Sequence, residues 1–90
     1  MKGVMSKMTA ARLIMYPNKR QHPLKSGYRP LFLINESYYS GIILFEGNDI
    51  THNEIRNVEI DFLTFKGHLN QGDIIKFYES PNNGIGEIHV

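Results

Sequence analysis

The chain has 90 residues, with ten lysines and arginines, nine aspartates and glutamates, and no cysteine. This length is enough for one small domain with a modest core, and too short for a core plus an elaborate catalytic cleft. The lack of cysteine excludes a disulfide framework and a thiolate metal site. No apolar run approaches the roughly 20 residues of a membrane-spanning helix, and the start has no signal-peptide core. We therefore expect one cytoplasmic domain with no membrane partner.

Charge is distributed unevenly along the chain. Residues 1–35 contain seven lysines and arginines and no acid, whereas residues 36–90 contain three such cations and all nine acids. A basic region of this kind is typical of a surface that binds a polyanion. Alternatively, the two regions neutralise one another across a folded sheet, because opposite charges on neighbouring strands are common. The sequence leaves both interpretations open.

Short segments in which apolar and polar residues alternate run through the chain, each ended by Gly, Pro or Asn. This period of two indicates strands rather than helices. Six strands are predicted, within residues 9–16, 28–35, 37–45, 54–65, 73–79 and 84–90. The last two form a hairpin across the turn-forming residues 80–83. Gly41 lies inside the third strand, where we expect a bulge or a bend.

Six short strands favour a small closed barrel or a sandwich, since closure removes exposed sheet edges. The predicted fold class is therefore all-β, with residues 9–90 as the domain and residues 1–8 as a flexible leader. The apolar faces of successive strands predict a common core. Its expected members are Leu13, Ile43, Val58, Ile60, Phe62 and Phe77.

No pattern of residues predicts catalysis or cofactor binding. The four histidines, His22, His52, His68 and His89, have spacings that match no metal motif. The chain has neither the serine-centred elbow of hydrolases nor the phosphate-binding loop that precedes a helix in nucleotide-binding proteins. We therefore expect no enzyme activity, no metal, no cofactor and no bound nucleotide.

Aromatic side chains are abundant, with five tyrosines and five phenylalanines. Tyr38 and Tyr39 are adjacent, so they point to opposite faces of a strand. One interpretation exposes a ring as a platform for stacking on a partner. The other places one ring inside and lays the second over the surface of the barrel.

Three segments, in their order along the chain, resemble the C-terminal β-barrel domain of translation elongation factor Tu. The first contains the motif G-Y-R-P, the second follows it by about ten residues, and the third is the final hairpin. Together they extend the resemblance over about residues 9 to 90. The matching positions are Arg20, Pro23, Gly27, Tyr28, Arg29, Pro30, Phe32, Gly41, Ile43, Gly47, Gly86 and Val90.

This resemblance implies a six-stranded antiparallel barrel without catalytic residues, because GTP hydrolysis belongs to a separate domain of the elongation factor. In that family the barrel contacts the T-arm backbone of aminoacyl-tRNA, the nucleotide exchange factor and the other two domains. The departures from the family pattern fall on the contact loops. Gln21 and His22 stand where the family has His and Thr, and the final turn, at residues 81–83, has lost its cation.

Two functional expectations follow. The first is a non-catalytic protein-interaction module that mimics the elongation factor barrel, either competing for its partners or acting as an immunity-type protein against a toxin that exploits the factor. The second is an accessory module that binds RNA, such as the tRNA backbone. We favour a protein partner, because the RNA-contact loops have lost cations while the barrel-building residues are retained. The candidate binding residues are Lys19, Arg20, His22, Lys25, Arg29, Tyr38 and Tyr39.

Overall fold

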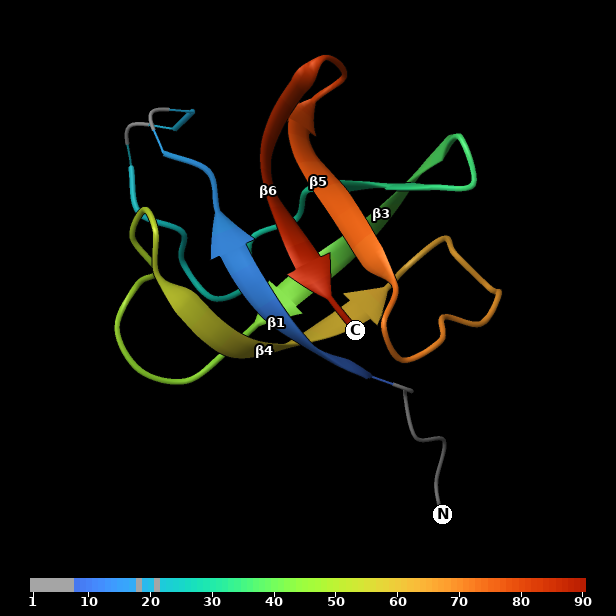
Figure 1. The fold of residues 1–90 in the computed structure, drawn as a ribbon, viewed down its shortest axis with the longest axis horizontal. Helices are drawn as coiled ribbons and strands as arrows, with labels where there is room; N and C mark the ends of the chain where they lie inside the picture. The colour runs from blue at the N-terminus through green and yellow to red at the C-terminus, as the bar shows by residue number, and fades with distance from the viewer. Residues whose placement is uncertain (1–7, 18, 21) are drawn as a thin grey trace.

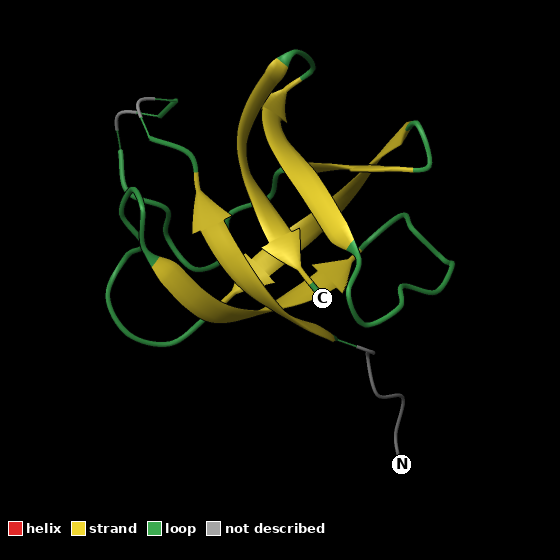
Figure 2. Ribbon diagram, viewed as in Figure 1, coloured by secondary structure: helices red, strands yellow, loops and turns green. Residues whose placement is uncertain are grey.

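The computed structural model describes residues 8–90 apart from Asn18 and Gln21, and these residues form strands and loops without a helix (Figure 2). The strands are β1 (Thr9–Met15), β2 (Leu31–Ile34), β3 (Ser37–Leu44), β4 (Ile55–Phe62), β5 (Ile74–Ser80) and β6 (Asn83–His89). The predicted all-β class and the six predicted strands are confirmed. Of the leader predicted for residues 1–8, all but Met8 lies outside the described residues.

The six strands close into an antiparallel barrel in the order β1, β4, β3, β2, β5, β6 (Figure 1). The closed barrel, rather than the sandwich, is therefore the correct alternative. The contact between β2 and β5 is the shortest ladder, with Leu31 opposite Tyr78 and Phe32 opposite Phe77. Strands β4 and β5 lie on opposite sides of the ring, because two strands separate them in either direction. In the part of the chain that the structure describes, no helix is long and apolar enough to cross a membrane.

The core forms from the inward side of each strand, as the alternation of the sequence requires. Five of the six predicted core residues are buried, and the exception is Phe62, which is half-buried. Phe62 is the last residue of β4, where its ring meets the rings of Phe32 and Phe65 at centroid distances of 5.0 and 5.6 Å. It therefore closes one end of the core. The buried apolar residues are Ala11, Leu13, Met15, Leu24, Phe32, Ile34, Ile43, Ile50, Val58, Ile60, Ile75, Phe77, Ile85 and Ile88.

Gly41 marks a change of partner along β3. Residues Ser37 to Ser40 pair with β2, and Gly41 to Leu44 pair with β4. A Cβ atom on Gly41 would lie 2.9 Å from a ring carbon of Phe32, so the missing side chain makes room for that ring. The register carries no bulge at Gly41. The register shifts lie instead in the hairpin of β5 and β6, on either side of Tyr78.

Candidate binding surface

Arg20, one of the cations of the predicted contact loop, is held by the barrel. Its Nη1 lies 3.1 Å from Oε1 of Glu79, and its guanidinium carbon lies 4.6 Å from the centroid of the Tyr28 ring. The side chain is 19% exposed. Burial raises the pKa of Tyr28, and the neighbouring Arg20 guanidinium partly offsets this by lowering it. Arg20 therefore ties the loop to the end of β5 rather than projecting into solvent.

Lys25 is also neutralised within the molecule, although its side chain is 81% exposed. Its Nζ lies 3.0 Å from Oδ2 of Asp49. Both ion pairs join the basic first part of the chain to the acidic remainder, so for Arg20 and Lys25 mutual neutralisation is the correct interpretation. The other cations of this loop are Lys19 and Arg29, both exposed, and His22 is exposed beside them.

Backbone pairing fixes the path of this loop across the barrel. Leu24 and Ile50, both fully buried, form an isolated antiparallel bridge with N–H to O distances of 2.8 and 2.9 Å. The Gly27 N–H donates to the Ile43 carbonyl at 2.7 Å, and Gly27 has a φ of 97°. That value explains why glycine stands in the G-Y-R-P motif, since other residues rarely adopt it.

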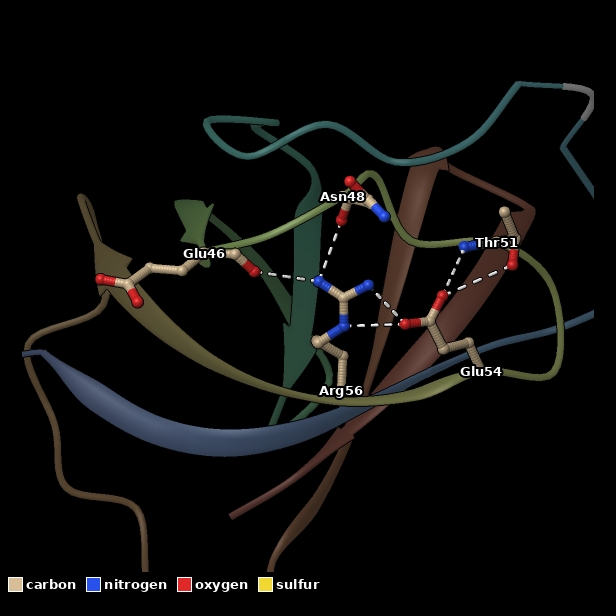
Figure 3. A network of polar contacts seen from close by, with 5 residues as sticks. All are labelled: Glu46, Asn48, Thr51, Glu54 and Arg56. Atoms are coloured by element: carbon tan, nitrogen blue, oxygen red, sulfur yellow. Dashed lines mark hydrogen bonds and ion pairs between the residues drawn. The ribbon is translucent and has the colours of Figure 1, made fainter.

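The loop that carries Asp49 and Ile50 is in turn braced by Arg56 (Figure 3). Arg56 donates from Nη1 to the carbonyl oxygens of Glu46 and Asn48 at 3.0 and 2.9 Å, and from Nε to Oε2 of Glu54 at 2.7 Å. The backbone N–H of Thr51 donates to the other carboxylate oxygen of Glu54 at 3.1 Å. This backbone hydrogen bond, together with Arg56, lowers the pKa of Glu54. The network is internally satisfied, so it positions the loops rather than offering a site.

The two adjacent tyrosines lie on opposite faces of β3, as expected. Tyr39 packs against the core, and its ring lies 5.0 Å from that of Phe65. Tyr38 is 42% exposed and packs edge to face against Tyr78, with ring centroids 5.3 Å apart. The arrangement with one ring inside and one over the surface is therefore the correct one. Of the two rings, Tyr38 is the more exposed.

Tyr38 leads to a contiguous surface along the outside of β5. Because Ile75 and Phe77 point into the core, their neighbours Ile74, Lys76 and Tyr78 point outward. Ile74 is 61% exposed, and it matters here because exposed rings lie on the same side of the strand. Tyr16, which follows β1, adds a further ring next to Lys76. We call this surface the β5 face, and its members are Tyr16, Tyr38, Ile74, Lys76 and Tyr78.

Aromatic rings surround the cation at the centre of the β5 face. Lys76 Nζ lies 5.6 Å from the centroid of the Tyr16 ring and 5.7 Å from that of Tyr78, within the range of cation–π contacts. The Tyr16 hydroxyl donates to Oε1 of Glu87 at 2.8 Å, and His89 Nε2 lies 2.5 Å from Oε2 of the same carboxylate. The hydrogen bond from Tyr16, and then that from His89, lower the pKa of Glu87.

A shallow groove also lies along β1 and β4. Its walls mix charged and apolar side chains, including Arg12, Glu59 and Phe45. Among the described residues, no buried side-chain nitrogen or oxygen lacks a hydrogen-bond partner, and no three metal-binding side chains lie together. Within the part of the chain that the structure describes, the groove therefore contains neither a buried unpaired polar atom nor a metal-binding cluster.

Sequence reasoning identified Tyr38 and missed the other four members of the β5 face. The sequence did contain part of the signal. Ile74 and Ile75 are adjacent, so one of them has to point outward. Because Phe77 was predicted in the core, Ile75 lies on the same inward side of the strand and Ile74 is the outward residue. Tyr16 and Lys76 are 60 residues apart in sequence and meet only because β1 and β5 flank β6.

No protein-family model matches this sequence, and no curated protein is significantly similar to it. A closed six-stranded barrel by itself does not identify the elongation factor domain. The resemblance to that domain thus continues to rest on the sequence motifs alone.

Proposed function

We propose that this chain is a non-catalytic protein-interaction module and that the β5 face is its binding surface. The observation that carries the proposal is the composition of that face, in which three tyrosines and one lysine lie in contact and an exposed isoleucine lies two residues from the lysine on the same side of β5. Tyrosine rings provide large contact areas at low conformational cost, and they are enriched among the residues that dominate binding energy. Scattered exposed apolar residues are ordinary, but apolar and aromatic residues joined in one patch favour a partner.

The alternative, RNA binding through the basic loop, has less support. Two cations of that loop, Arg20 and Lys25, are paired with Glu79 and Asp49. Each phosphate contact made by these residues would have to replace an existing ion pair. The resemblance to the elongation factor barrel supports a narrower form of the protein hypothesis, in which the chain mimics that barrel to compete for its partners or to intercept a toxin.

The chain offers a matched pair of isoleucines for testing the proposal. Ile74 on β5 and Ile55 on β4 are 61% and 62% exposed, and their strands lie on opposite sides of the ring. Wild-type protein, Ile74→Glu and Ile55→Glu are immobilised and exposed to cell extract with and without ribonuclease treatment, and the affinity of each retained protein is then measured. We expect Ile74→Glu to weaken binding by about thirtyfold, as for a residue worth roughly 2 kcal/mol.

The Ile55→Glu variant is expected to bind as the wild type does. Equal binding by Ile74→Glu, or a loss confined to Ile55→Glu, would contradict the assignment of the β5 face. A partner that disappears on ribonuclease treatment would instead support the RNA alternative. Circular dichroism and thermal unfolding check that each variant is folded.

A further inference from the structure

The central cation of the β5 face lacks the carboxylate that the sheet register places beside it. Lys76 and Glu87 are directly opposite each other on β5 and β6. Such a cross-strand pair normally forms a salt bridge. Here the Glu87 carboxylate is occupied by the Tyr16 hydroxyl at 2.8 Å and by His89 at 2.5 Å. Glu87 therefore forms no direct ion pair with Lys76, and the lysine acts on it only through a longer-range attraction that adds to the lowering of the Glu87 pKa.

Lys76 lies instead against aromatic rings, which attract its ammonium group without neutralising it. Its Nζ lies over Tyr16 and Tyr78 at 5.6 and 5.7 Å, and the residue is exposed. Within residues 8–90 other than Asn18 and Gln21, no carboxylate lies at ion-pairing distance from Lys76 Nζ. A carboxylate supplied from outside would gain a charge-assisted hydrogen bond here, next to two aromatic rings.

Apolar positions flank this cation along the strand. Ile74 precedes Lys76 by two residues, so its Cα lies about 6.7 Å from that of Lys76 on the same face of the sheet. Tyr78 follows by two residues at the register shifts of the hairpin, and its ring centroid lies 5.7 Å from Lys76 Nζ. Tyr38 enlarges the apolar surface beyond Tyr78. An extended segment that binds here would thus meet an apolar contact, a cation and an aromatic contact in succession.

We propose that the partner of the β5 face is a protein segment that presents a carboxylate to Lys76, an inference that rests on the proposed function of this face. The carboxylate lies between two apolar side chains, of which one contacts Ile74 and the other contacts Tyr38 and Tyr78. A phosphate of RNA shares the anionic chemistry, but it would gain nothing from the exposed isoleucine. The ordered placement of apolar groups on both sides of Lys76 favours a polypeptide.

A peptide-display selection tests this proposal, because a random library presents acidic and apolar side chains in every order. Such a library is selected against the folded wild-type chain and against Lys76→Glu, with Lys66→Glu as control. Lys66 is exposed in the loop between β4 and β5, so Lys66→Glu changes the net charge equally while leaving the β5 face intact. We expect wild type and Lys66→Glu to enrich peptides with Asp or Glu between apolar residues, and Lys76→Glu to bind these peptides at least tenfold more weakly.

The outcomes separate this inference from the proposed function. The proposal of an acidic partner would be wrong if the enriched peptides lacked an acid, or if they bound Lys76→Glu as tightly as wild type. In that case the β5 face would still be the binding surface if Ile74→Glu weakened the binding of these peptides. Peptides that bind Ile74→Glu and wild type equally would overturn both. If selection enriches no peptide and a single-stranded RNA oligonucleotide binds in a Lys76-dependent manner, the partner of the β5 face would be a polyanion rather than a polypeptide.

Discussion

At the scale of single residues, Tyr16 shows how a partly buried hydrogen bond contributes to the β5 face. Its ring contributes to the face and lies beside Lys76, while its hydroxyl donates to Glu87, the residue opposite Lys76 in the sheet register. Burial, and then the hydrogen bond to Glu87, raise the pKa of Tyr16 to about 12. The neutral phenol is thus the form that the folded chain requires.

We predict that Tyr16 ionises with a pKa of about 12 in the folded chain. The measurement is the phenolate absorbance that wild type shows and Tyr16→Phe lacks. Because this pKa lies above the ordinary value of 10.0, Tyr16 contributes stability below pH 10 that is lost as the pH rises through about 12. Chemical denaturation should show a smaller alkaline loss for Tyr16→Phe than for wild type. Glu87→Gln should lower the Tyr16 pKa but leave it above 10, since burial remains. A Tyr16 component at its ordinary pKa would show that the hydroxyl is exposed.

Two glycines of β6 provide a second test at this scale. A Cβ on Gly86 would lie 2.6 Å from the Ile14 carbonyl oxygen and 2.6 Å from a ring carbon of Phe77, neither of which can move easily. We expect Gly86→Ala to lower the free energy of unfolding by about 1 to 3 kcal/mol, the usual cost of overpacking. The Cβ of Gly84→Ala meets the flexible end of Lys76, so this control should stay within about 0.5 kcal/mol of wild type. Equal losses in the two variants would contradict the close packing at Gly86.

At the scale of elements, the strands were predictable and the loop contacts were not. Alternation of apolar and polar residues places a strand to within a few residues, because a shift of one residue would turn its apolar side chains to solvent. The contacts of Arg20 and Lys25 depend on which acids the closed barrel brings near them, and Glu79 and Asp49 are distant in sequence. For this reason the sequence alone could not decide whether the basic region binds a polyanion or is neutralised by the acidic region.

The network around Arg56 leads to a prediction about the loops. Because it holds the loop that contains Ile50, its loss should loosen the bridge between Ile50 and Leu24. In Arg56→Met, amide hydrogen exchange at Leu24 and Ile50 should be roughly two- to tenfold faster, which corresponds to the loss of one net hydrogen bond. Lys66→Met, in a loop away from this network, is the control. Unchanged exchange at both amides would mean that the bridge forms without the Arg56 brace.

At the scale of the whole molecule, the fold separates the two surfaces that the sequence combined into one candidate site. The seven candidates include Tyr38, which belongs to the β5 face, and Arg20 and Lys25, which link the loop to the barrel. Residue type alone does not distinguish a cation that binds a partner from one that pairs internally. That distinction depends on the carboxylates that surround each cation after folding, and Lys76 differs from Lys25 in this respect.

The last prediction contrasts the loop with the β5 face. Replacing Lys19, Arg20 and Lys25 together by Ala removes the ion pairs to Glu79 and Asp49 and the contact of Arg20 with the Tyr28 ring. Ion pairs at the surface contribute about 0 to 1 kcal/mol each, so the variant should remain folded with a lower thermal midpoint. If the partner binds the β5 face, its dissociation rate should be unchanged in this variant, and only the association rate should fall slightly through weaker electrostatic steering. Ile74→Glu should show the reverse, with faster dissociation. For an RNA partner, the triple variant would instead lose about one unit of log–log salt slope for each phosphate contact removed. A large rise in dissociation rate confined to the triple variant would therefore move the binding surface from the β5 face to the basic loop.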